Sequence, residues 1–240
     1  MEVRNKLLNF KDAYIYQNDD WFKFSLDSVL LANFVTINLR SKKILDLATG
    51  NAPIPMLLTY RTKAQIFGIE LQKEIYDLGQ KSIIVNDMAK QIHLLNIDIK
   101  DANKYLGFEQ FDVVTCNPPY FKTNNKELLN NDKIKAIARH EIFLNIDDVC
   151  NIASNSLKNK GIFALVHRPE RFLEILDTMK KYNIVPKKIQ FVYPKIEKEA
   201  NMVLIEGIKN GNSGVKLLNP IIVYDSDNNY NSNIKKMFEE

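Results

Sequence analysis

The segment DLATGNAPIP, residues 46–55, joins an apolar run to a predicted helix, an arrangement that brings a ligand close to backbone amides. A dinucleotide-binding fingerprint has several glycines in this turn, but here only Gly50 is present, with Ala48 and Ala52 at the neighbouring small positions. A pyrophosphate needs closer backbone approach than these Cβ atoms allow. S-adenosylmethionine (SAM) ends in a carboxylate and an ammonium group, so it tolerates alanine better. The loop therefore favours SAM, and a turn used only for strand–helix packing is the alternative.

Acidic residues follow the predicted strands at positions that suit a nucleoside. Glu70 ends the second strand, where a carboxylate can accept hydrogen bonds from both ribose hydroxyls. NAD would use the same device, so Glu70 does not separate the two cofactors. Asp98 can accept from an adenine amino group, and Asp46 can orient the loop or meet the cofactor's ammonium group through water. The residues expected to contact SAM are Asp27, Asp46, Ala48, Thr49, Gly50, Glu70, Leu71, Asp98, Ile99 and Asn117.

An Asn-Pro-Pro-Tyr corner, residues 117–120, ends the apolar run 111–116, which predicts a buried strand. Proline has no N–H and a fixed φ angle, so the chain can neither extend the strand nor begin an ordinary helix at once. We therefore treat the corner as a candidate for chemistry, and a proline-rich turn after a strand is the alternative.

Short apolar runs alternate with helical periods along the chain. Strands are predicted at 42–47, 65–70, 91–95, 111–116 and 161–167, and helices at 144–157 and 169–182 among others. This alternation predicts a parallel sheet covered by helices on both faces. Two more strands, 187–194 and 200–209, lack a helix-length spacer and fit a hairpin at the far edge of the sheet. The predicted fold is α/β and Rossmann-like, with a mostly parallel seven-stranded sheet whose last strand is antiparallel.

Bulk composition restricts the class of protein. The chain has 240 residues with 45% hydrophobic content, which fits one domain: a core at 37–225, a covering element at 1–36 and a polar tail at 226–240. A run of about 18 apolar residues is absent, so we expect a cytoplasmic protein without a membrane span. Cys116 and Cys150 lack metal-ligand spacing and the histidines are scattered, so no metal site is expected. The oligomeric state is left open.

A basic segment follows residue 157. Between residues 158 and 198 there are ten Lys or Arg residues against four acids, which suits a polyanionic partner. A solvated lysine-rich surface is at least as good an explanation from charge alone, since the whole sequence is rich in lysine.

The corner resembles motif IV of class I SAM-dependent methyltransferases that modify planar amide or amino nitrogens. The resemblance covers nearly the whole chain. FKFSLDSVLLANF is similar to the N-terminal cofactor-covering element of that family, and LDLATGNA to its degenerate glycine loop. ARHE (138–141), VHRPERF (166–172) and KEANMVLIEGIKNG resemble segments of the bacterial subgroup that methylates N6 of adenine 37 in valine tRNA. The resemblance thus implies SAM as cofactor and tRNA as partner.

The family resemblance also implies chemical roles for the residues of the Asn-Pro-Pro-Tyr corner. An exocyclic adenine amine is a weak nucleophile because its lone pair is delocalised into the ring. The Asn117 side-chain carbonyl and the Pro118 backbone carbonyl are expected to hold its two hydrogens during direct in-line methyl transfer. Tyr120 offers a stacking face, worth about 1–3 kcal/mol. Further substrate contacts are expected at Pro119, Phe121, Arg139, His140, Arg168 and Arg171, although local salt bridges are an equal alternative for the charged ones.

Other functions fit parts of this pattern. Glutamine N5 methylation in a protein poses the same chemical problem, but the basic segment speaks against it, and guanine N2 in ribosomal RNA is a related possibility. A non-catalytic RNA-binding protein with a vestigial fold is compatible with the degenerate loop. A nicotinamide oxidoreductase is disfavoured by the missing glycines.

Overall fold

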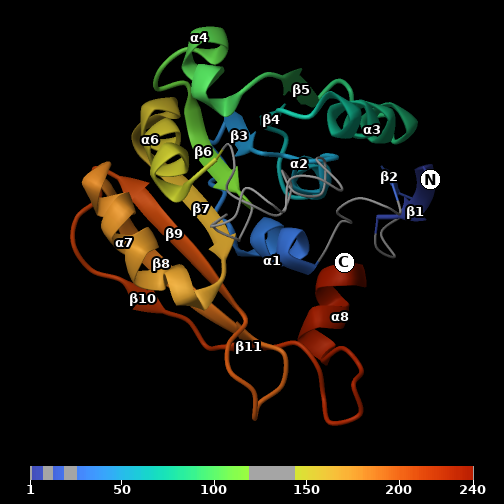
Figure 1. The fold of residues 1–240 in the computed structure, drawn as a ribbon, viewed down its shortest axis with the longest axis vertical. Coiled ribbons are helices and arrows are strands. Elements are labelled where there is room, and N and C mark those ends of the chain that lie inside the picture. The colour runs from blue at the N-terminus through green and yellow to red at the C-terminus, as the bar shows by residue number, and fades with distance from the viewer. Residues whose placement is uncertain (1, 8–12, 19–25, 119–143, 240) are drawn as a thin grey trace, which may run out of the picture.

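The computed structural model of the chain describes residues 2–7, 13–18, 26–118 and 144–239 (Figure 1). Its central sheet contains β3 (Lys43–Leu47), β4 (Gln65–Glu70), β5 (Ile92–Asn96), β6 (Phe111–Cys116), β7 (Leu157–His167), β8 (Ile184–Tyr193), β9 (Met202–Lys209), β10 (Lys216–Leu217) and β11 (Ile221–Ile222). The strand order is β10-β8-β9-β7-β6-β3-β4-β5, and β11 pairs with β8. β9 is antiparallel to both of its neighbours, and the other pairings are parallel.

Helices cover both faces of this sheet (Figure 1). One face packs against α1 (Leu26–Phe34), α2 (Pro53–Thr59), α3 (Lys73–Val85) and α8 (Ser232–Glu239), and the other against α4 (Ala102–Leu106), α6 (Ile146–Ser156) and α7 (Phe172–Lys181). Two short 3₁₀ helices, η1 (Ile99–Asp101) and η3 (Pro169–Arg171), follow β5 and β7. In β7, Val166 joins one core and Leu165 the other. The strands are therefore apolar on both faces, as parallel sheets between helix layers require.

The predicted α/β fold class is confirmed, but the predicted number of seven strands is too low. The described residues form a nine-stranded sheet, because β10 and β11 each add two residues alongside β8. A strand of two residues is too short to show the alternation of apolar and polar side chains by which a sequence pattern reveals strands. The hairpin of β8 and β9 also differs in detail, since β9 inserts between β7 and β8 and β10 forms the edge.

The N-terminal segment forms a separate hairpin of β1 (Glu2–Lys6) and β2 (Tyr14–Asn18) that docks on α3. Asn86 pairs with Tyr14 as a neighbouring strand would, accepting from its N–H at 2.9 Å and donating to its carbonyl at 2.7 Å. The Ser82 hydroxyl accepts from the Tyr16 N–H at 2.9 Å. Side chains of the helix thus satisfy an edge of β2 that would otherwise be unpaired.

Helix α1 is fixed at its C-terminal end by cations. The Arg61 guanidinium donates to the carbonyls of Ala32 and Val35, the latter at 3.0 Å, and Lys188 Nζ donates to the Phe34 carbonyl at 2.7 Å. The last carbonyls of a helix lack intrahelical donors and carry a partial negative charge, so these contacts stabilise the helix end. Six of the nine residues of α1 are buried, so the helix is held firmly against the core.

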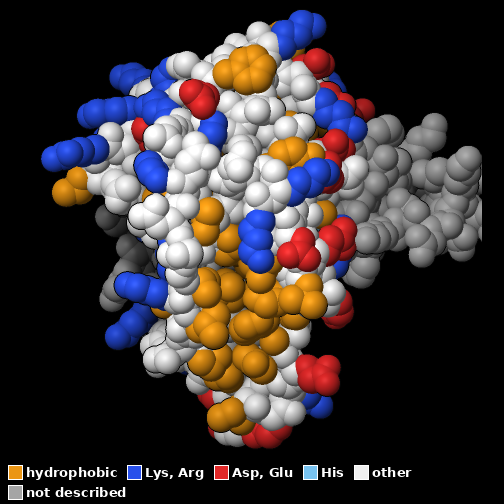
Figure 2. Space-filling model, turned by 90° about the vertical axis from the view of Figure 1, so that its left-hand side faces the viewer, with side chains coloured by type: hydrophobic (Ala, Val, Ile, Leu, Met, Phe, Trp, Pro, Cys, Tyr) orange, Lys and Arg blue, Asp and Glu red, His pale blue; other side chains and the backbone are white. Residues whose placement is uncertain are grey.

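The face that carries α7 and β10 exposes apolar side chains, which gather over its lower half (Figure 2). Leu173 and Leu217 are each 72% exposed, and Val215 and Leu218 are also exposed. This apolar face lies along the outer edge of the sheet, whereas Gly50, Glu70 and Asn117 follow the central strands β3, β4 and β6.

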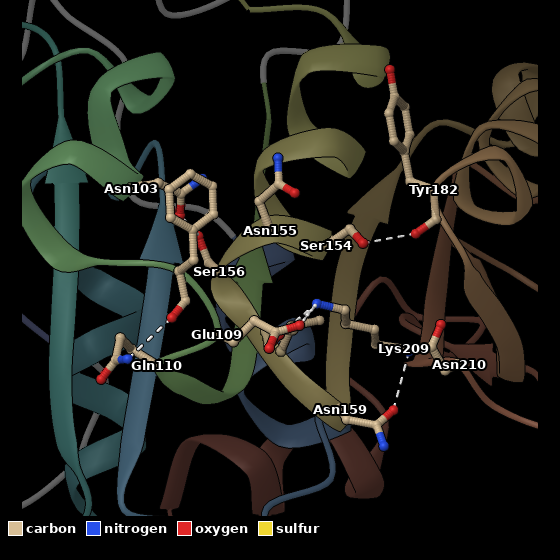
Figure 3. Close-up of polar contacts among 12 residues, drawn as sticks. Asn103, Glu109, Gln110, Ser154, Asn155, Ser156, Asn159, Tyr182, Lys209 and Asn210 are labelled. Atoms are coloured by element: carbon tan, nitrogen blue, oxygen red, sulfur yellow. Dashed lines mark hydrogen bonds and ion pairs between the residues drawn. The ribbon is translucent and has the colours of Figure 1, made fainter.

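At the amino ends of β6 and β7, a buried lysine joins three segments of the chain (Figure 3). Lys209, the last residue of β9, is 9% exposed. Its Nζ donates to the Leu157 carbonyl at 2.9 Å and to Glu109 Oε1 at 2.8 Å. A buried ammonium group is tolerated only when it is paired in this way.

We predict that Lys209→Met lowers the free energy of unfolding by about 1–3 kcal/mol, because the Leu157 carbonyl loses its buried donor. Urea unfolding followed by circular dichroism measures the change. The matched control is Lys160→Met, since Lys160 is exposed and contacts a backbone carbonyl at the surface. That control should change stability by less than about 0.5 kcal/mol. Equal effects of the two substitutions would contradict the role given to Lys209.

Candidate functional site

The loop after β3 adopts an unusual backbone conformation. Ala48, Gly50 and Ala52 have φ angles of 52°, 60° and 70°, in the left-handed region that favours glycine. The Thr49 N–H donates to the Ile69 carbonyl at 2.8 Å, which attaches the loop to the end of β4. A Cβ atom added at Gly50 would meet no heavy atom within 4 Å. Glycine adopts this conformation without the strain that a Cβ atom adds at Ala48 and Ala52, and open space lies beside it in which a ligand could approach the backbone.

Asp46 lies beneath this loop with 0% exposure and joins it to the neighbouring strand. Its Oδ2 accepts from the Thr49 hydroxyl at 2.6 Å, and its Oδ1 accepts from the Thr115 hydroxyl at 2.6 Å. Burial raises the pKa of Asp46 to about 7, although the two hydroxyl hydrogen bonds oppose this rise. Asp46 thus connects the loop to the end of β6, where the Asn117 corner begins.

Glu70 closes the other side of the loop. Its Oε2 accepts from the Gly50 N–H at 2.9 Å and its Oε1 accepts from the Gln72 N–H at 2.8 Å. Burial raises the pKa of this carboxyl, and the backbone hydrogen bonds from Gln72, Gly50 and Leu71 work against that rise. Because each carboxylate oxygen has further lone-pair capacity, Glu70 can hold the loop and still accept from a ribose hydroxyl.

The strand ends beside Glu70 carry the remaining predicted cofactor residues. Asp98 caps η1, and its Oδ1 accepts from the Lys100 N–H at 2.9 Å, whereas Ile99 is buried. Leu71 is 39% exposed. The predicted set did not include Asn96, whose Nδ2 donates to the carbonyls of Glu70 at 2.8 Å and Leu71 at 2.9 Å. Its position at the end of β5, directly opposite Glu70 at the end of β4, is the sequence signal that could have identified it.

The corner is described as far as Pro118. Asn117 follows β6, and its Nδ2 is 3.3 Å from the Ser28 hydroxyl of α1. Asp27, in the first turn of α1, is the neighbour of that serine. The predicted residues Pro119, Tyr120, Phe121, Arg139 and His140 lie outside the described residues.

The basic segment is less available for a polyanion than its composition suggests. Arg171 is 9% exposed, and its guanidinium holds both carboxylate oxygens of Glu174, at 3.0 and 2.7 Å. Arg168 Nη1 donates to the Asn201 carbonyl at 3.0 Å. Other ion pairs of this segment are Lys158–Asp112, Lys180–Asp177, Lys181–Asp147 and Lys188–Glu206. For Arg171 the sequence left a phosphate contact and a local salt bridge as alternatives, and the structure shows the salt bridge.

Two absences concern the described part of the chain alone. Residues 2–7, 13–18, 26–118 and 144–239 contain no cluster of three His, Cys, Asp or Glu side chains suited to a metal ion. Among the same residues, no helix combines the length and apolar character that crossing a membrane demands.

We predict that Asp46→Asn changes the pH dependence of stability. A carboxyl whose pKa is raised in the folded state binds a proton there that the unfolded chain releases, so the wild-type protein loses stability as pH rises from about 4 to 7. Asparagine cannot ionise, so the free energy of unfolding of the variant relative to wild type should increase over that window, by up to about 1.4 kcal/mol per pH unit.

Urea unfolding at pH 5, 6, 7 and 8 measures this difference. Asp101→Asn, at an exposed residue of η1, is the matched control, and the pH dependence measured for it is the baseline for replacing an aspartate by asparagine. A pH dependence for Asp46→Asn no greater than this baseline would contradict the raised pKa of Asp46.

Comparison with known proteins places this geometry in a family. Residues 29–174 match the family model described as N-6 DNA Methylase. A tRNA1(Val) (adenine(37)-N6)-methyltransferase of Cytophaga hutchinsonii is 24% identical over 202 residues, which cover 84% of this chain and 83% of that protein. The enzyme of the same name from Porphyromonas gingivalis is 27% identical over 206 residues, covering 83% and 80%.

Solved structures give the same fold. A predicted O-methyltransferase from Agrobacterium tumefaciens matches with a TM-score of 0.70 at 22% identity, over 88% of this chain and 95% of that one. The Thermus thermophilus 16S rRNA N2 G1207 methyltransferase, solved with AdoMet and guanosine, matches with a TM-score of 0.60 at 18% identity, over 87% and 50%. The predicted class I methyltransferase fold is confirmed, and the chain belongs to the N-6 DNA Methylase family.

Proposed function

We propose that this protein transfers a methyl group from SAM to the exocyclic N6 of an adenine in tRNA, most specifically adenine 37 of valine tRNA. The observation that carries the proposal is the connection of the loop after β3 to the Asn117 corner through Asp46. One buried carboxylate holds Thr49 of the loop and Thr115 of the strand that leads to Asn117. A cofactor site and an amide acceptor are thereby fixed next to each other. The names of the relatives support adenine in tRNA as the acceptor.

The residues at the strand ends fit SAM. The backbone around Gly50 borders open space, which suits the methionine end of the molecule, and Glu70 offers a carboxylate to the ribose. Asp98 follows β5, which lies beside β4, so its carboxylate suits the adenine end of the molecule. SAM supplies an electrophilic methyl group on a sulfonium centre when it is bound.

The chain's own contribution is to hold the acceptor nitrogen. The Asn117 carbonyl and the Pro118 backbone carbonyl accept the two amine hydrogens, which favours the tetrahedral geometry that nitrogen reaches during transfer. A general base is not required, because the methylated nitrogen carries a positive charge and can release one of its own two hydrogens as a proton to water afterwards. Alignment of the amine with the methyl group provides the larger part of the rate enhancement.

The substrate class is tested by methyl transfer from tritiated SAM to total tRNA, ribosomal RNA and protein, followed by nucleoside analysis. We expect label in tRNA as N6-methyladenosine. Label in ribosomal RNA as N2-methylguanosine, or label in protein alone, would contradict the tRNA proposal while keeping the methyltransferase chemistry. Absence of SAM binding in calorimetry would favour a non-catalytic RNA-binding protein.

The role of the corner is tested by Asn117→Ala. Removing one preorganised hydrogen-bonding group at a reacting centre costs about 10²–10³-fold in kcat, and we expect a loss of that size with SAM affinity largely retained. The matched control is Asn159→Ala, whose side chain contacts Asn210 at the opposite end of the strands (Figure 3). The control should keep the wild-type rate. A wild-type rate for Asn117→Ala would exclude the proposed mechanism.

A further inference from the structure

Ser28 is a polar residue in a position that otherwise belongs to the core. It lies near the start of α1 and is 3% exposed. The other buried residues of α1 are apolar: Val29, Leu30, Leu31, Ala32 and Phe34. Its hydroxyl accepts from Asn117 Nδ2 at 3.3 Å, across 89 positions of the sequence. A buried hydroxyl in an apolar helix face costs free energy unless it is used, so its contact with the corner is informative.

The helix that carries Ser28, α1, is held in place by polar contacts with other parts of the chain. Arg61 and Lys188 bind the carbonyls at the C-terminal end of α1, as described above. The residue that follows the helix by two positions, Thr36, donates through its N–H at 2.7 Å and its hydroxyl at 2.9 Å to the buried Glu206 of β9. α1 is thus tied to both the loop after α2 and the central sheet. Ser28 therefore lies buried on a helix that is fixed to the sheet at its C-terminal end.

The chemistry of an amide makes this contact directional. An asparagine side chain has a carbonyl oxygen on one side of its plane and an NH₂ group on the other, and only the oxygen can accept. The proposed reaction needs an acceptor for the hydrogens of the target amine. If the amide were reversed, its NH₂ group would meet the NH₂ group of the substrate, donor against donor. The site therefore needs a device that selects one of the two amide orientations.

We propose that Ser28 is a positioning residue that binds the Asn117 NH₂ group and thereby directs the Asn117 carbonyl oxygen toward the target amine. This inference rests on the proposed function, since it assigns the acceptor role to Asn117. Ser28 itself does not contact the reacting atoms in this mechanism. Its contribution to the rate comes from favouring one of the two amide orientations, and the size of that effect is set by one neutral hydrogen bond.

The test compares Ser28→Ala in two backgrounds. In the wild-type background we expect kcat to fall about fivefold, the equivalent of one neutral hydrogen bond, with KM for SAM and for tRNA unchanged. In the Asn117→Asp background the residue at 117 has an acceptor oxygen on each side of its plane, so its orientation no longer matters. The Ser28 hydroxyl can still donate to this carboxylate but no longer selects between unlike atoms, so adding Ser28→Ala to Asn117→Asp should lower kcat by a clearly smaller factor than in the wild-type background.

Two further variants separate positioning from packing. Ser28→Thr keeps the hydroxyl and should retain most of the wild-type kcat. Ser154→Ala removes another buried serine hydroxyl, which donates to the Tyr182 carbonyl at 2.7 Å, and should leave kcat unchanged (Figure 3). Thermal unfolding of every variant checks that the fold is intact.

The outcomes are distinguishable. A wild-type kcat for Ser28→Ala, or equal losses in the two backgrounds, overturns the positioning role even if tRNA methylation is established. If the wild-type protein methylates protein glutamine instead, the tRNA proposal fails but the comparison of backgrounds still applies, because an amide nitrogen needs the same acceptor. The same holds for guanine N2 in ribosomal RNA, and a protein that methylates none of these three acceptors overturns both proposals.

Discussion

The buried carboxylate of Asp46 is the interaction on which the arrangement of the site depends. It is fully enclosed, yet it accepts from Thr49 in the loop after β3 and from Thr115 in β6. Burying a carboxyl group is unfavourable, and its raised pKa of about 7 reflects that cost. The two hydroxyl hydrogen bonds offset part of it. The result is a short, rigid connection between the segment suited to the cofactor and the segment suited to the acceptor.

The topology of the sheet explains why such a connection is possible. β3 lies between β4 and β6, so the chain segments that leave its carboxyl end meet those that leave both neighbours. From β3 the chain continues to β4 and β5 on one side and then returns to form β6 on the other side. In an open α/β sheet, such a reversal of strand order leaves a crevice at the carboxyl ends of the strands, where ligands bind. Glu70 comes from one neighbour and Asn117 from the other. Leu47 and Cys116 are paired residues at the ends of β3 and β6, which brings the loop and the corner together.

Residues of the N-terminal part of the chain contact the segments at the carboxyl ends of these strands. Asn51, next to Gly50, donates to the Tyr16 carbonyl of the docked hairpin at 2.8 Å, and Ser28 of α1 contacts Asn117. Through Tyr16 and Ser28, the described part of the predicted covering element contacts the loop after β3 and the corner after β6. In the basic segment, by contrast, Arg171 and several lysines are engaged in local ion pairs, so net charge is a poor guide to where a polyanion could bind. Exposed ion pairs contribute little to stability, but they do reduce the charge that a partner meets.

The sequence by itself determined the fold class, the loop at residues 46–55 and the Asn117 corner, because strand periodicity, small residues and prolines are local properties of the chain. It did not reveal β10 and β11, which are too short to have a period, and it left open whether Arg171 contacts a phosphate or forms the local salt bridge with Glu174 that the structure shows. Nor could it show that Ser28 meets Asn117 or that Asp46 bridges two segments. Those contacts join residues that are 89 and 69 positions apart, and only the packing of α1 and β6 against β3 and its neighbours brings them within hydrogen-bonding distance.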